Sequence, residues 1–115
     1  MKILLALLLA TAAFAADFAG KWTAAIDTQI GVQNYTYEFK VDGTKVTGRA
    51  KSQFGDVEIT EGTINGDEIT FVENVSFQDM ALRIVYKGKI SGDEIKFKRD
   101  VADVASEEFV AKRAK

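Results

Sequence analysis

Glu61-Gly-Thr-Ile-Asn-Gly-Asp-Glu-Ile-Thr-Phe71 recurs 26 residues later as Lys87-Gly-Lys-Ile-Ser-Gly-Asp-Glu-Ile-Lys-Phe97. A shorter echo, Val41-Asp-Gly-Thr-Lys-Val46, precedes both copies. In each, apolar residues flank a short segment that contains glycine, which predicts a β-hairpin because glycine supplies the positive φ that tight turns need. In the first copy the two-residue loop is either Gly66-Asp67 in a type II′ turn or Asn65-Gly66 in a type I′ turn. Both choices keep Ile64 and Ile69 on one face.

Apolar and polar residues alternate with a period of two through most of the chain from residue 17 onward, which is typical of strands with one buried face. In the fourth strand the phase changes near Thr60-Glu61, which indicates a β-bulge. We expect one all-β domain, an eight-stranded antiparallel up-and-down meander barrel, because closure removes exposed strand edges. The expected strands are 21–28, 33–42, 45–53, 56–64, 68–77, 81–90, 94–101 and 106–114.

The first residues have the pattern of a cleavable signal peptide. Lys2 gives a positive start, an apolar run follows, and Ala13-Phe14-Ala15 provides small residues at a cleavage site. Asp17 arrives too early for a membrane-spanning helix of roughly 20 residues. We therefore expect a signal peptide at 1–15 (to 16 at most), a single barrel domain at 16–115, no membrane span, and a secreted or periplasmic location.

The amino-acid composition excludes several kinds of catalytic and metal site. The chain contains no His and no Cys, which removes imidazole bases, Cys or Ser–His nucleophile sites, disulfides and ordinary zinc sites. Without Lys2 the chain has 14 basic and 17 acidic residues, a mild excess that argues against a nucleic-acid partner. We expect no enzyme activity, no metal site and no cofactor.

Two charged residues interrupt the inward apolar phase at equivalent positions of the repeat. Glu73 follows Ile69 and Phe71, and Arg99 follows Ile95 and Phe97. Either both lie at the barrel rim, or they form a paired polar site in the lumen that orients a ligand. One strand separates them, so we expect contact across a gap such as Gly88, or a bridge through a water or a ligand group. We find no second carboxylate on the face of Glu73, as a glycosidase would require.

Gly20-Lys21-Trp22 and Arg113 carry a resemblance to a known group of barrels. Their positions, at the start of the first strand and near the end of the last, resemble those in the calycins, which comprise lipocalins, fatty-acid-binding proteins and avidins. The resemblance implies that Gly20, Trp22 and Arg113 close the barrel, with the cation over the indole. The Gly-Asp-Glu-Ile-x-Phe repeat also resembles uncharacterised small secreted bacterial proteins, a likeness that implies no particular activity.

The expected function is therefore a secreted, non-enzymatic binding module. One hypothesis is a carrier that holds a small apolar or amphipathic ligand in the barrel, with polar contacts from Glu73, Arg99, Tyr35, Tyr37 and Tyr86. The alternative is a filled barrel that acts as a structural domain or contacts a protein or glycan. The small inward face of the third strand (Val46, Gly48, Ala50 and Ser52) leaves both open: aromatic side chains of the second strand cover it, or it borders a cavity.

Overall fold

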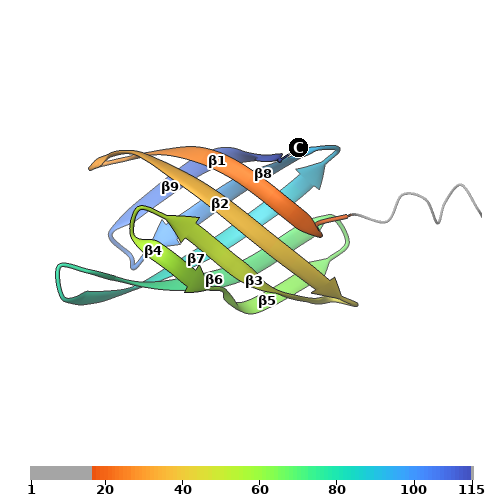
Figure 1. Cartoon of the computed structure of the whole chain (residues 1–115), viewed down its shortest axis with the longest axis horizontal. Helices are drawn as coiled ribbons and strands as arrows, with labels where there is room; N and C mark the ends of the chain where they lie inside the picture. Colours follow the sequence, from red (N-terminus) through yellow and green to blue (C-terminus); the bar gives the residue numbers. More distant parts are fainter. Residues whose placement is uncertain (1–16, 115) are drawn as a thin grey trace, which may run out of the picture.

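The computed structural model describes residues 17–114, apart from the side chain of Phe77, so the expected signal peptide lies outside the described residues. The strands are β1 (Gly20–Thr28), β2 (Gly31–Asp42), β3 (Lys45–Ser52), β4 (Gly55–Glu58), β5 (Thr60–Asn65), β6 (Glu68–Phe77), β7 (Met80–Ser91), β8 (Glu94–Val101) and β9 (Ala105–Arg113). They wrap into one barrel (Figure 1). β4 and β5 are the two halves of the strand expected at 56–64.

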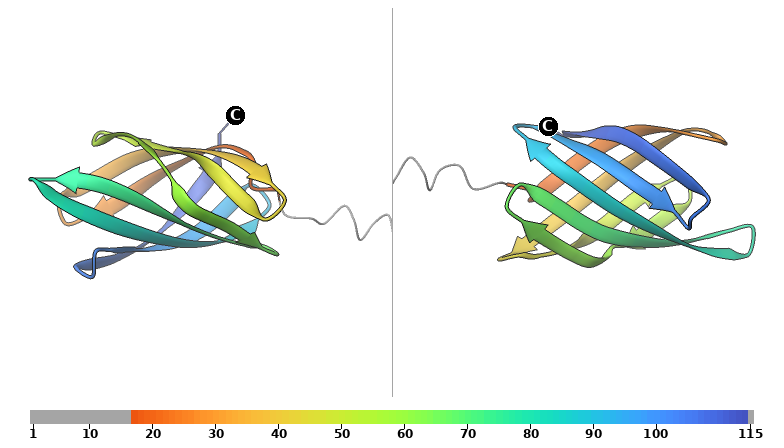
Figure 2. Two further views of the ribbon diagram at one scale, coloured as in Figure 1. Left: turned by 90° about the horizontal axis from the view of Figure 1, so that it is seen from below. Right: turned by 180° about the vertical axis from the view of Figure 1, so that it is seen from behind.

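The strands pair in a closed antiparallel ring. Sequence neighbours pair along the meander, β3 pairs with both halves of the split strand, and β2 pairs with both β1 and β3. The ring closes between the first and last strands, where Trp22 lies opposite Arg113 and Thr23 opposite Lys112. The closed eight-stranded barrel with up-and-down order is therefore confirmed, and Figure 2 shows it from below and from behind.

The predicted bulge is confirmed in the split strand. The register between β5 and β6 shifts between Thr60 and Thr63, and Glu61 has a φ of 54°. An extra residue at this point bends the strand and changes the alternation of inward and outward side chains between Val57 and Ile64. Close approach of the strands also explains Gly48, because a Cβ there would lie 1.8 Å from the backbone oxygen of Glu38.

The hairpins of the repeat lie at one end of the barrel, together with both termini of the described chain (Figure 1). Gly66 has a φ of 63°, Asp67 has a negative φ, and Asn65 pairs with Glu68. The loop is therefore Gly66-Asp67, and positive φ at its first residue alone is the signature of type II′. Of the two turns that the sequence allows, the structure has this one.

Side chains fill the half of the barrel that lies toward this end, which we call the closed half. Rings of Tyr37, Phe71, Tyr86 and Phe97 contact one another with centroids 4.3–6.0 Å apart. Ala50 on β3 is fully buried opposite Tyr37, so aromatic side chains of β2 cover this part of the small face. Phe18, also fully buried, completes this half. The closed half corresponds to the filled barrel of the alternative hypothesis.

Candidate functional site

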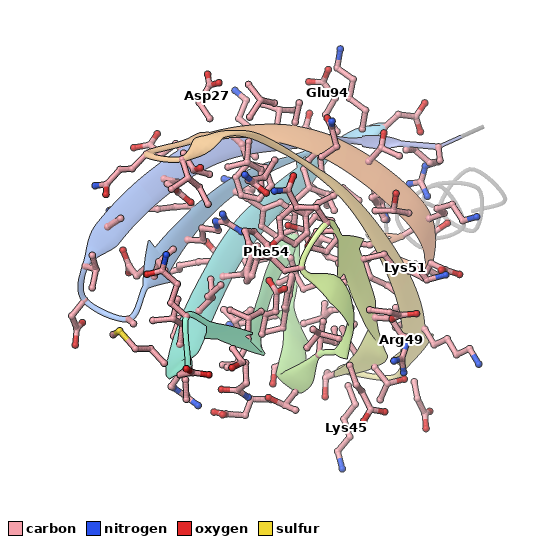
Figure 3. All side chains as sticks on the ribbon, turned by 60° about the vertical axis from the view of Figure 1, so that its left-hand side comes forward. Asp27, Lys45, Arg49, Lys51, Phe54 and Glu94 are labelled. Carbon is pink, nitrogen blue, oxygen red and sulfur yellow. The ribbon has the colours of Figure 1, made fainter. Side chains whose placement is uncertain are left out.

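The other end of the barrel contains a hollow of about 260 Å³, which is open to solvent. Four turns surround it: those between β1 and β2, β3 and β4, β6 and β7, and β8 and β9 (Figure 1). Figure 3 looks toward this end, with Phe54 in the region of the opening. The walls are mainly apolar, and include Ile84, Leu82, Val75 and Val101. The barrel is thus filled in one half and hollow in the other, which we call the open half.

Polar side chains lie at and beneath the floor of the hollow, and the buried Tyr86 hydroxyl is the centre of their hydrogen-bond network. It donates a hydrogen bond to Glu73 Oε1 (2.7 Å) and accepts one from Tyr37 Oη (3.0 Å) and one from Arg99 Nη1 (2.9 Å). A phenolic oxygen has one proton and two lone pairs, so its capacity is fully used. Tyr35 Oη adds a longer bond to Glu73 Oε2 (3.4 Å).

Strand register explains why these groups meet. Arg99 on β8 lies between its cross-strand partners Tyr86 on β7 and Glu107 on β9. Glu73 on β6 is opposite Ile84, which places it diagonally next to Tyr86. All four side chains project from the same face of the sheet because each shares the inward phase of its strand.

Arg99 is bound to a second carboxylate that we did not predict. Its Nε donates to Glu107 Oε1 at 2.6 Å, and the two side chains are only 5% and 11% exposed. Its Cζ also lies 5.2 Å from the centroid of the Tyr35 ring. The expectation that no other carboxylate shares the inner face with Glu73 was therefore wrong. Glu107 lies two residues before the buried Phe109, so the inward phase of β9 already contained it.

The structure also corrects the expected bridge between Glu73 and Arg99. Both are buried in the lumen, at 1% and 4% exposure. Tyr86, on the strand that separates them, joins them through its hydroxyl, so no water or ligand group is needed. Gly88 leaves no gap for contact, because the Phe97 ring lies 2.5 Å from where its Cβ would be.

Burial shifts the pKa values of the ionisable side chains at and beneath the floor. It raises the pKa of Glu73 above its usual value, although the bond from Tyr86, the charge of Arg99 and the bond from Tyr35 act in the opposite direction. Burial likewise raises the pKa values of Tyr37 and Tyr86 well above normal. These tyrosines are therefore neutral hydrogen-bond donors at physiological pH. The raised pKa means that Glu73 binds a proton more tightly in the folded protein than an exposed glutamate does.

Apolar residues at the turns form a rim around the hollow. Ile30, Met80 and Val104 line its entrance and are 57%, 58% and 69% exposed. Four non-glycine residues in two of these turns, Gln78, Asp79, Ala102 and Asp103, have positive φ values of 46–64°. Positive φ at both Gln78 and Asp79, the two residues between the paired Phe77 and Met80, is what a type I′ hairpin turn requires.

The residues expected to close the barrel lie at the opposite end. Arg113 Cζ is 4.3 Å from the Trp22 ring, and a Cβ on Gly20 would lie 4.0 Å from Arg113 Nη1. Arg113 also donates to the backbone oxygens of Asp17 and Ala19. Trp22 Nε1 donates to the Phe18 oxygen at 2.9 Å. These residues thus lie away from the hollow, where they tie both ends of the described chain together.

The structure brings all five sequence-predicted polar residues into one cluster, but only Tyr35 and Arg99 line the hollow. Glu73, Tyr37 and Tyr86 lie behind them and are buried. Most of the other lining residues were not predicted, and Glu107 and Gln33 are the ones that matter for the polar floor. Gln33 lies two residues before Tyr35, so the same inward phase could have identified it.

Comparisons with known proteins provide no further assignment: no protein-family model matches the chain, and no curated protein matches it significantly in sequence. Within residues 17–114 no helix is long and apolar enough to span a membrane. The same residues contain no group of three His, Cys, Asp or Glu side chains that could hold a metal ion.

Proposed function

We propose that the protein is an exported, non-enzymatic carrier that binds a small apolar or amphipathic molecule in the open half of its barrel. The observation that carries the proposal is the hollow itself, with apolar walls above a polar floor. Small-molecule sites generally combine these two features. At about 260 Å³ the hollow is slightly smaller than typical sites for drug-sized ligands, which favours a small molecule.

The calycin resemblance belongs to this proposal. An indole under a cation where the first and last strands meet is the closing arrangement that the resemblance implies, and Trp22 and Arg113 have this arrangement. Calycins use the lumen of such a barrel to hold ligands. In this chain the ligand would occupy only the open half, because aromatic rings fill the rest.

The test is to block the hollow. Ala105 lines it, and Ala105→Trp places an indole in the space that a ligand would fill. We expect the neutral fluorescent probe N-phenyl-1-naphthylamine to bind the unmodified protein and to lose at least about tenfold in affinity in this variant. Ala81→Trp is the control, since Ala81 is exposed and does not line the hollow. Equal probe binding by all three proteins would contradict the proposal.

A second candidate is a domain that docks another protein, and the exposed rim favours it. Three large apolar side chains around one opening are typical of an interaction surface as well as of a ligand entrance. Replacement of Ile30, Met80 and Val104 by serine would abolish such docking, whereas a blocked hollow would not. A partner that binds the Ala105→Trp variant normally would support this second function over the carrier.

A further inference from the structure

Gln33, one of the residues that line the hollow, has a buried polar atom without a hydrogen-bond partner. Gln33 is 2% exposed, and its Oε1 is the single buried side-chain N or O atom in the described part of the chain without a hydrogen bond. Gln33 lies on the inner face of β2, next to Tyr35, and lines the hollow. An unpaired buried amide oxygen costs about 1–3 kcal/mol, so a group that binds it gains a preformed acceptor.

We propose that Gln33 recognises the hydroxyl group of a small, uncharged alcohol. This inference rests on the carrier function proposed above and specifies its ligand class. The carboxamide of Gln33 offers both an acceptor and donors, and a hydroxyl group can donate and accept at once. A hydroxyl therefore satisfies the amide in either of its two orientations, which a carboxylate or an ammonium group cannot do.

The charges around the floor support a neutral head group. Arg99 is already paired with Glu107 at 2.6 Å, and Glu73 is buried and accepts a hydrogen bond from Tyr86. A carboxylate head would be a third acidic group beside one guanidinium, and it would lose its hydration on entry. An ammonium head would also lose its hydration, and Glu107, the carboxylate that lines the hollow, is already paired with Arg99. A hydroxyl avoids both costs.

The volume limits the length of the alcohol. A cavity of about 260 Å³ holds roughly nine groups of the size of a water molecule, at about 30 Å³ each. An unbranched alcohol of about eight carbons fits this space, with its chain against Leu82, Ile84 and Val101. A longer chain emerges between the exposed Ile30, Met80 and Val104 of the rim.

Calorimetric titration with 1-octanol, octanoate and octylammonium at neutral pH tests the inference, because these probes share one chain and differ in the head group. We expect 1-octanol to bind at least about tenfold more tightly than either charged probe. Gln33→Leu should weaken 1-octanol binding by about 3–10-fold and leave the binding of the charged probes unchanged. Gln53→Leu is the matched control, since Gln53 is exposed and outside the hollow.

The other outcomes separate a failure of the hydroxyl inference from a failure of the carrier function. Equal affinity for the three probes, tighter binding of a charged probe, or a hydroxyl preference that survives Gln33→Leu would overturn the inference and leave the carrier function intact. Failure of 1-octanol, octanoate, octylammonium and N-phenyl-1-naphthylamine alike would overturn the carrier function as well. If Gln33→Leu does not fold, Gln33→Met serves the same comparison, because it also keeps the volume and removes the amide.

Discussion

The Tyr86 hydroxyl is a hydrogen-bond partner of three buried polar side chains beneath the hollow. Glu73, Arg99 and Tyr37 each use this oxygen as a partner, and Tyr86 itself is fully buried. Tyr86→Phe removes the oxygen and keeps the ring. We expect it to lower the free energy of unfolding by about 2–4 kcal/mol, because three buried polar groups lose a partner at once. Urea denaturation followed by circular dichroism measures the change.

Tyr37→Phe is the matched comparison for this prediction. Tyr37 is as buried as Tyr86, but within residues 17–114 its hydroxyl forms a single hydrogen bond, which it donates to Tyr86. We expect its loss to cost about 1 kcal/mol. Equal destabilisation by the two variants would show that Tyr86 is not the centre of the network.

Between the first and last strands, the ladder that closes the barrel is short. The register of β1 and β9 includes only two residue pairs within the described chain, one of which is Trp22 with Arg113. Trp22→Ala should lower the free energy of unfolding by about 3–5 kcal/mol, because the indole is fully buried. Arg113→Ala should cost less, since the side chain is partly exposed.

The double variant tests whether Trp22 and Arg113 stabilise each other. Because the guanidinium lies 4.3 Å from the indole, the two losses should be non-additive by about 0.5–2 kcal/mol in a double-mutant cycle. Arg113→Lys should recover little, since a single ammonium cannot reproduce the bonds to Asp17, Ala19 and Asp93 together. Additive losses would mean that the cation and the ring do not stabilise each other.

The strands were predictable from the sequence because the alternation of apolar and polar residues in each strand reflects which of its faces is buried. Period-two alternation and the repeated Gly-Asp-Glu-Ile turns predict the meander, and the change of phase near Thr60 predicts the bulge. The site was predictable only in part. Glu73 and Arg99 stood out because they replace apolar residues in a repeat, whereas Glu107 and Gln33 lie at strand positions without such a comparison.

Contacts across the lumen were beyond sequence reasoning, because alternation does not specify which side chain lies opposite which. The barrel brings Tyr35 and Tyr37 of β2 to Glu73 and Tyr86 on the opposite wall. How far the aromatic rings fill the lumen also depends on the barrel as a whole. For this reason the sequence could not choose between a filled barrel and a hollow one, and the structure contains a half of each.

The stability of the whole barrel should depend on pH through Glu73. Its pKa is raised by burial, so the folded protein binds a proton more tightly than the unfolded chain does. Glu73 therefore contributes stability at low pH that is lost as pH rises from the ordinary carboxyl pKa through the raised one. Glu73→Gln should remove this loss, and urea midpoints measured from acid to neutral pH should decline less in the variant. An identical decline in both proteins would assign it to other groups.

The start of the barrel sets a limit on where an exported chain can be processed. Phe18 is fully buried, its oxygen accepts the Trp22 indole proton, and the Asp17 oxygen accepts from Arg113. Cleavage beyond Asp17 would remove contacts of the closed half, whereas cleavage after Ala15 or Ala16 leaves them intact. We therefore predict that protein recovered outside the cytoplasm begins at Ala16 or Asp17, and intact-mass measurement can determine this. A chain engineered to begin at Ala19 should unfold at a lower temperature, because the barrel end loses the Phe18 side chain. Recovery of exported protein that still begins at Met1, or of one that begins at Ala19 with unchanged stability, would contradict this account of the N-terminus.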